Sequence, residues 1–136
     1  MADKNQLYRI LDANLNRTKE GLRVCEDISR YIWDQKALTK ALKNLRHQLT
    51  LAMAKINMLK ALENRCVEGD VGRGSILSEL KRTDVSSVFL ANAGRVKESL
   101  RVLEEISKLL NTNVSQNLKS LRYRFYVLEQ KAFKRS

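Results

Sequence analysis

The sequence predicts an all-α protein, a four-helix up-down bundle built from two duplicated helical hairpins with an irregular glycine-rich connection between the halves. The first observation is composition: 136 residues without proline, 43% hydrophobic and 30% charged, with few aromatics, which favours helices over sheet. The second is that long stretches carry apolar residues at spacings of three and four, the period of amphipathic helices. The third is an internal repeat.

The repeat runs from Asp12 to Arg30 and again from Leu90 to Lys108, at an offset of about 78 residues. About 11 of its 19 positions are identical. A shorter sequence, L-K-N-L-R ending at Arg46, returns as L-K-S-L-R ending at Arg122. Each half is therefore predicted to be one hairpin, over about residues 5–56 and 84–133, and both lie in a single domain spanning residues 1–136.

The first half contains two predicted helices. Asp3 or Asn5 caps a first helix that carries the repeated motif and ends near Trp33. Asp34 then caps a second helix, over about residues 35–56, in which leucines recur at helical spacing.

The second half repeats this plan after an irregular connection. Three of the five glycines lie between Glu68 and Gly74, and Ser75 begins a short helical turn over residues 76–81. Asp84 is the predicted N-cap of a long helix over residues 85–110. A turn over residues 111–113 leads into a last helix, residues 114–133.

Each copy of the motif carries an asparagine, an arginine and a glutamate at the same positions. On a helical wheel the asparagine and the arginine fall among apolar residues, with the glutamate one turn further on. One interpretation is a buried ion pair between arginine and glutamate that fixes helix register. The other is that each set opens into a cleft and binds an anionic ligand. The residues are Asn14, Arg17 and Glu20 in the first copy and Asn92, Arg95 and Glu98 in the second.

The formal net charge of +11 favours polyanionic partners, either nucleic acid, an acidic membrane or phosphorylated small molecules. Nucleic acid is disfavoured because the sequence lacks the interleaved aromatics of a stacking surface. The two cysteines lack metal-site spacing, and Cys25 is expected in the core. No segment is apolar enough for a signal peptide or a membrane span, so a cytoplasmic protein is expected.

Further candidates are weaker as motifs. Guanidinium groups at Arg46, Arg101 and Arg122 suit phosphate oxygens, although a solvated basic face is the common alternative. The segment containing Gly69, Asp70 and Gly72 could bring backbone N–H groups to a phosphate and a carboxylate to a metal ion, or could be a plain connector. His47, the only histidine, is either structural or part of the site.

Five motifs in this order resemble a known family, the small all-helical hydroxymethylpyrimidine-phosphate kinases of thiamine biosynthesis. The same module is similar to the N-terminal domain of some thiamine-phosphate synthases. The resemblance covers residues 8–110. It is carried by Arg9-Ile-Leu-Asp-Ala-Asn14, Glu20-Gly-Leu-Arg-Val24 with Glu26-Asp27, Leu45-Arg-His47, Gly69-Asp-Val-Gly72, and Ala91-Asn92 followed by Arg95, Glu98 and Leu100-Arg-Val-Leu-Glu-Glu105.

The resemblance implies phosphomethylpyrimidine kinase activity, the transfer of the ATP γ-phosphoryl group to 4-amino-5-hydroxymethyl-2-methylpyrimidine phosphate. ATP and Mg²⁺ would be the cofactors, and inward-facing arginines would neutralise charge. On this hypothesis the catalytic residues are Arg17, Arg95 and Asp70, and the metal ligands are Asp70, Glu20 and Glu98. The substrate or ATP would be bound by Asn14, Glu20, Arg46, His47, Gly69, Gly72, Asn92, Glu98 and Arg101.

Two alternatives to the kinase stay open. One is a basic helical module that binds RNA or DNA, and the other is a non-catalytic partner that associates with thiamine-phosphate synthase. The internal symmetry also allows a homodimer about the same axis.

Overall fold

The computed structural model describes residues 3–75 and 80–134. Its helices are α1 (Lys4–Tyr31), α2 (Lys36–Met53), α3 (Met58–Glu63), α5 (Val85–Ser107) and α6 (Thr112–Lys134). These ranges contain no strand, and the prediction of an all-helical bundle is confirmed. The short helix α3 was not predicted. The helical turn expected over residues 76–81 falls mainly on positions 76–79, outside the described residues.

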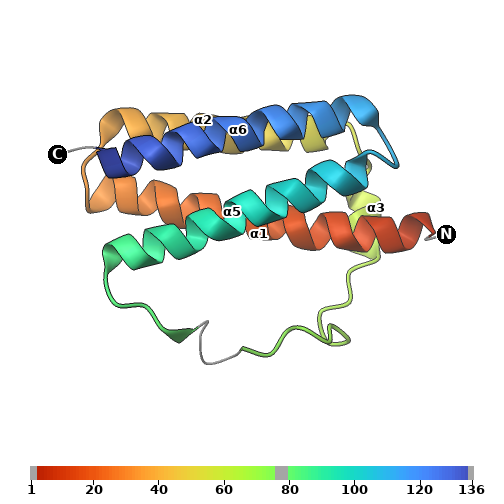
Figure 1. Cartoon of the computed structure of the whole chain (residues 1–136). Helices are drawn as coiled ribbons and strands as arrows, with labels where there is room; N and C mark the ends of the chain where they lie inside the picture. The colour runs from red at the N-terminus through yellow and green to blue at the C-terminus, as the bar shows by residue number, and fades with distance from the viewer. Residues whose placement is uncertain (1–2, 76–79, 135–136) are drawn as a thin grey trace.

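The four long helices pack as two layers, with α1 beside α5 and α2 beside α6 (Figure 1). In each of these pairs the two helices run in opposite directions. The segment between α3 and α5 travels back along the bundle, so α5 starts at the end where α2 starts and runs the same way (Figure 1). The irregular connection predicted around the glycines is therefore also the crossover that sets the direction of the second hairpin.

The helix starts follow capping chemistry, with one correction. The carboxylates of Asp3 and Asp84 each accept a hydrogen bond from a backbone N–H three residues on, as expected for N-caps. Asp34 does not cap α2, because Gln35 occupies the cap position and Asp34 adopts a left-handed conformation with φ 50°. Asn111 caps α6 by accepting from the N–H groups of Asn113 and Val114.

Two helix ends also differ from the predictions. Helix α2 was expected to reach Ile56 but ends at Met53, and α5 was expected to reach Leu110 but ends at Ser107. Ile56 and Leu110 nevertheless pack on the core from the turns that follow. Apolar periodicity therefore continues past the last helical residue, which explains why it overestimates helix length.

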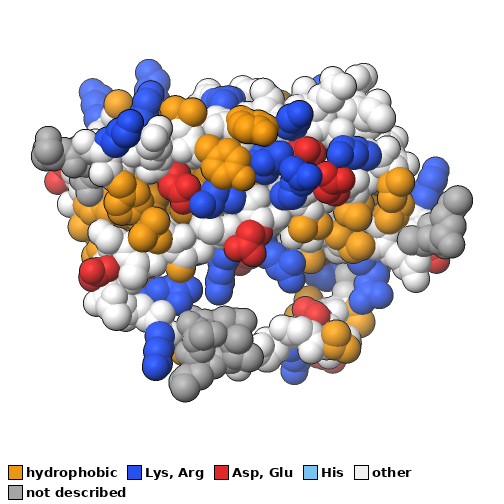
Figure 2. Space-filling view, viewed as in Figure 1, with side chains coloured by type: hydrophobic (Ala, Val, Ile, Leu, Met, Phe, Trp, Pro, Cys, Tyr) orange, Lys and Arg blue, Asp and Glu red, His pale blue; other side chains and the backbone are white. Residues whose placement is uncertain are grey.

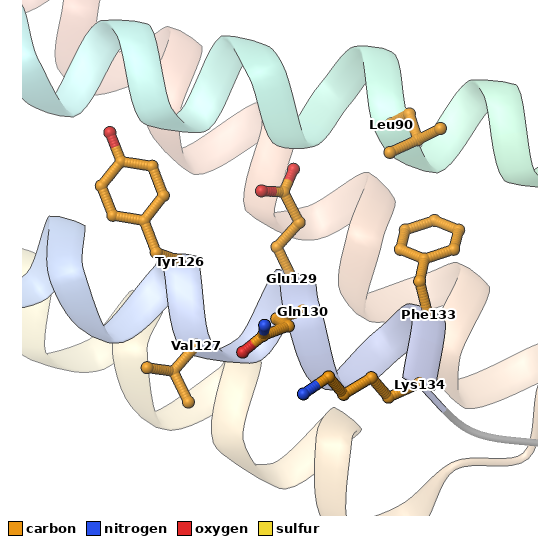
Figure 3. A pocket seen from close by; sticks show the side chains of 7 residues that line it. All are labelled: Leu90, Tyr126, Val127, Glu129, Gln130, Phe133 and Lys134. Atoms are coloured by element: carbon orange, nitrogen blue, oxygen red, sulfur yellow. The ribbon is translucent and has the colours of Figure 1, made fainter.

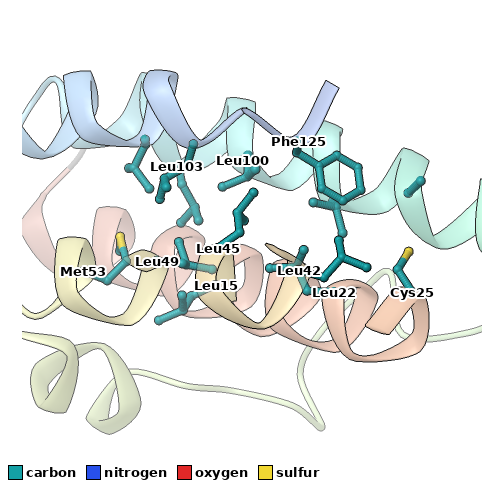
Figure 4. Packing of buried hydrophobic residues seen from close by; sticks show 14 of the residues in the cluster. Leu15, Leu22, Cys25, Leu42, Leu45, Leu49, Met53, Leu100, Leu103 and Phe125 are labelled. Atoms are coloured by element: carbon teal, nitrogen blue, oxygen red, sulfur yellow. The ribbon is translucent and has the colours of Figure 1, made fainter. Parts of the chain in front are cut away.

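One apolar cluster joins all four long helices (Figure 4). Leu22, Leu45, Leu100 and Phe125 are fully buried, one from each long helix. Cys25 is also fully buried, as predicted for a core residue. The cluster closes at one end with three aromatic rings, those of Trp33, Phe89 and Phe133, whose centroids lie 5.0–6.0 Å apart.

The crossing of α1 and α5 shows the internal two-fold relation in its contacts. The hydroxyl groups of Thr18 and Ser99 lie 2.6 Å apart. A Cβ on Gly21 would come within 2.8 Å of Val96 Cγ2. At the repeat offset Thr18 corresponds to Val96 and Gly21 to Ser99, so these are the same contact seen from the two halves.

Candidate functional site

Each hairpin contains one buried ion pair at the same place. Arg46 Nε lies 3.2 Å from Glu26 Oε1, and Arg122 Nε lies 3.0 Å from Glu104 Oε1. The four residues correspond in the repeat. A buried ion pair that fixes the packing of each hairpin therefore exists, but it uses Glu26 and Glu104 instead of the glutamates considered in the sequence.

The expectation that Arg17 and Arg95 point into the bundle is wrong, because both side chains are exposed. Among the described residues, Arg17 donates a single hydrogen bond, a long one of 3.4 Å to Asn14 Oδ1. The position lies at the edge of the buried arc of α1, between buried Asn14 and Gly21. A long arginine side chain at such an edge reaches solvent while its stem covers apolar surface, so wheel position alone misplaces the charge.

The other members of the repeated set are also placed by the structure. Asn14 Nδ2 donates to Ile10 O and Asn92 Nδ2 to Val88 O, both at 2.9 Å, so each amide bonds to its own helix. Glu20 and Glu98 are exposed, and no ion pair involves either of them within the described residues. The repeated set is therefore brought to the α1–α5 side of the bundle but not to a closed pocket.

The predicted residues Glu98 and Arg101 meet others in a groove between α5 and α6, which has a volume of about 520 Å³. Figure 2 shows Lys and Arg side chains interspersed with acidic and hydrophobic ones on the face formed by these two helices. We call this the α5–α6 groove. It is lined by Gly94, Lys97, Glu98, Arg101, Arg122 and Tyr126.

Arg122 is the most constrained cation of the α5–α6 groove. Its Nε donates to Glu104, and its Nη1 donates to Tyr126 Oη at 3.3 Å. The rings of Tyr123 and Tyr126 lie 5.0 and 5.8 Å from its guanidinium carbon, within cation–π range. Burial by itself would lower the pKa of Arg122, but the hydrogen bonds from its guanidinium to Glu104 and Tyr126 and the charge attraction of these groups together raise the pKa.

The other cations of this groove are paired at its rim. Lys97 Nζ lies 3.0 Å from Glu129 Oε1, and Arg101 Nη2 lies 3.1 Å from Glu105 Oε1. These pairs hold the charges in place and partly neutralise them. An anionic group that enters the groove would meet positioned N–H donors but would compete with carboxylates for them.

The remaining predicted residues lie elsewhere. Asp70 is exposed and accepts from Gly72 N at 2.9 Å, a local turn in the connection that also contains Gly69. His47 is exposed on α2. Asp70 is not joined by Glu20 or Glu98, and the part of the chain that the structure describes has no group of three His, Cys, Asp or Glu side chains placed to hold a metal ion. The expected metal ligand set is therefore not assembled.

A second groove, the end groove, continues from the α5–α6 groove past Tyr126 toward the end of α6 (Figure 3). It has a volume of about 620 Å³, and its apolar members include Leu90 and Phe133. Sequence reasoning missed this groove because neither residue is identical in the two halves: Leu90 stands opposite Asp12 in the repeat, and Phe133 lies outside the repeated motifs. It also missed Glu26 and Glu104, although their identity in both halves beside Arg46 and Arg122 was a usable signal.

None of the described helices is both long enough and apolar enough to cross a membrane. A protein-family model with the description "ThiD2 family" matches residues 9–131. No solved structure matches the chain significantly.

The chain is similar to three curated proteins, each named "Thiamine-phosphate synthase". The protein from Rhodopirellula baltica is 40% identical over 92% of this chain and 34% of its own length. The protein from Thermosynechococcus vestitus is 42% identical over 95% of this chain and 36% of its own. The protein from Nostoc punctiforme is 41% identical over 90% of this chain and 34% of its own length. The chain thus spans about a third of the length of these relatives.

The comparisons correct the enzyme assignment made from the sequence. The expected phosphomethylpyrimidine kinase activity is contradicted, because the curated relatives are named for thiamine-phosphate synthase, a different reaction. The expectation of ATP as a cofactor depended on that assignment and loses its support with it. The similarity to a domain of thiamine-phosphate synthases is confirmed.

Proposed function

We propose, from the premise that this chain belongs to the ThiD2 family, that it serves thiamine biosynthesis as a non-catalytic helical partner of thiamine-phosphate synthase. The observation that carries the proposal is the coverage of the match. Over 90% of this chain aligns with about a third of each relative named for that enzyme. The same helical unit thus occurs there in one chain with a further part that makes up about two thirds of the relative's length, and units that share one chain commonly act together.

Within this role the α5–α6 groove is the proposed place for a phosphorylated small molecule, the class of ligand expected from the sequence. Arg122 supports this assignment, because Glu104 and Tyr126 hold its guanidinium in a fixed position. Arg101 and Glu98 of the predicted site line the same groove. A held guanidinium can receive a phosphate without a further loss of side-chain freedom.

The proposal is tested with this chain and a purified thiamine-phosphate synthase that lacks the helical unit. Size-exclusion chromatography with light scattering is expected to show a complex, and the chain alone is expected to show no turnover of phosphorylated pyrimidines. A net charge of +11 could cause non-specific adhesion at low salt, so the measurement is repeated at about 0.5 M salt, where exposed charges are largely screened. A specific complex should persist there. No complex at either salt concentration would contradict the proposal.

A further inference from the structure

We propose that the end groove is the docking site for a short amphipathic helix of the synthase, bound to α5 in the way that α3 binds α1 within this chain. The inference rests on the proposed function and names the surface and the kind of segment that carry it. Its basis is that the two hairpins are duplicates, yet among the residues that the structure describes only the first hairpin has a covering helix.

The first hairpin shows what the covered face looks like. Helix α3 packs against α1, and its Ala61 is fully buried. Directly after α3, Arg65 donates two hydrogen bonds of 2.8 Å to the carboxylate of Asp12 on α1. Asp12 is only 8% exposed as a result.

The second hairpin leaves the corresponding positions open. At the repeat offset, Leu90 on α5 corresponds to Asp12, and Leu90 is 51% exposed. Phe133 corresponds to Asn57, the residue that caps α3 in the first half, and Phe133 is 43% exposed. Leu90 and Phe133 lie across the end groove from each other (Figure 3).

The chemistry of the end groove favours an apolar helix face over a polar ligand. Val127 extends the exposed apolar surface beyond Leu90 and Phe133. The carboxylate of Glu129 is bound by Lys97, so Lys134 gives the rim a net positive character. A helix with one apolar face and acidic residues beside it matches this pattern.

Charge also argues against a second copy of this chain as the occupant. Each copy carries a formal net charge of +11, and Lys134 at the rim makes no ion pair with the described residues, so two copies brought together there would repel each other. The partner is therefore inferred to be a different, more acidic surface.

The test measures the affinity of this chain for the synthase that lacks the helical unit, by isothermal titration calorimetry. The variant Leu90→Gln/Val127→Gln should raise Kd about tenfold or more, because both side chains line the end groove and the docked helix would cover them. Leu109→Gln/Leu51→Gln is the matched control. It removes two exposed leucines outside the end groove, one of them the repeat counterpart of Val127, and should leave Kd unchanged.

The outcomes separate the two proposals. Equal affinity of both double variants and the unaltered chain would overturn the docking site and leave the proposed function intact. No binding by the unaltered chain would overturn both. Self-association of the unaltered chain that Leu90→Gln/Val127→Gln abolishes would identify a second copy as the occupant and overturn the assignment to the synthase. Circular dichroism and thermal unfolding verify that each variant is folded.

Discussion

The two hairpins of this molecule have a common plan and different surroundings. Both contain a buried glutamate–arginine pair at the same place, Glu26 with Arg46 and Glu104 with Arg122. In the first hairpin α3 and Arg65 cover the outer side of α1, whereas in the second the end groove is open. Identical residues thus supply the buried ion pair of each hairpin, whereas positions that differ, such as Asp12 against Leu90, determine which outer face is covered.

The largest expected difference concerns the two buried ion pairs. Glu104→Gln should lower the free energy of unfolding by about 3 kcal/mol, because it leaves the guanidinium of Arg122 buried without its counter-charge. Glu26→Gln should cost less, since the Arg46 side chain is more exposed than that of Arg122, 16% against 7%. Urea denaturation measures both. Equal costs would show that burial of the arginine does not set the penalty.

Two glycines should respond with opposite signs to the same substitution. A Cβ at Gly21 would press on Val96 Cγ2 and on Asn92 O, at 2.8 and 3.0 Å. Gly21→Ala is therefore expected to lower the free energy of unfolding by about 1 to 2 kcal/mol despite the better helix propensity of alanine. At Gly94 the nearest atom is Glu98 Oε1 at 3.7 Å, so Gly94→Ala should stabilise by up to about 1 kcal/mol.

Thermal unfolding of the two glycine variants provides the measurement. A stabilising Gly21→Ala would mean that α1 and α5 do not pack as closely as the structure has them. A destabilising Gly94→Ala would mean that another group lies closer to Gly94 than the structure places any.

A smaller difference is expected at a pair of equivalent serines. Ser29 Oγ lies 2.8 Å from Thr39 Oγ1 and donates to Gln35 O. Its repeat counterpart Ser107 is buried, and its hydroxyl has no hydrogen-bond partner among the described residues. Ser29→Ala should cost about 1 kcal/mol, and Ser107→Ala should be neutral or slightly stabilising. Chemical denaturation of both variants checks this, and a larger loss for Ser107→Ala would refute it.

The two cysteine thiols of the folded chain should differ in their reactivity toward a disulfide reagent. Burial raises the pKa of the Cys25 thiol to about 12, so the thiol stays protonated at neutral and mildly alkaline pH and cannot act as a nucleophile. Cys66 is exposed. A disulfide reagent at pH 8 should therefore modify one thiol per native chain, and Cys66→Ser should abolish the reaction. Modification of both thiols without denaturant would contradict the burial of Cys25.

The bundle could be predicted because its causes are local or repeated. The spacing of the leucines predicts the long helices, Asp3 and Asp84 predict where two of them begin, and the repeat predicts two hairpins. The orientation of Arg17 and Arg95 could not be predicted this way, because helix periodicity assigns a direction to Cα–Cβ and not to the end of a long side chain. The true partner of Arg46 lies on another helix, which periodicity within one helix cannot reveal.

The short helix and the end groove were missed for a different reason. Helix α3 has six residues, too few for apolar periodicity to stand out, and its stability comes from packing on α1. The end groove is lined by Leu90 and Phe133, which are far apart in sequence and belong to no recognisable motif together. Once the structure sets the repeat in space, the comparison of Leu90 with Asp12 makes the open face visible.

Hydrogen–deuterium exchange of the chain with and without the synthase that lacks the helical unit tests the central claim most directly. A helical partner that docks through its second hairpin should gain protection at the start of α5 around Leu90 and at the end of α6 around Phe133. Protection of α3 around Ala61, and of the α1 face that α3 covers, should not change, because this face is already occupied within the chain. Protection that falls on α1 and α3 and spares α5 and α6 would contradict the account.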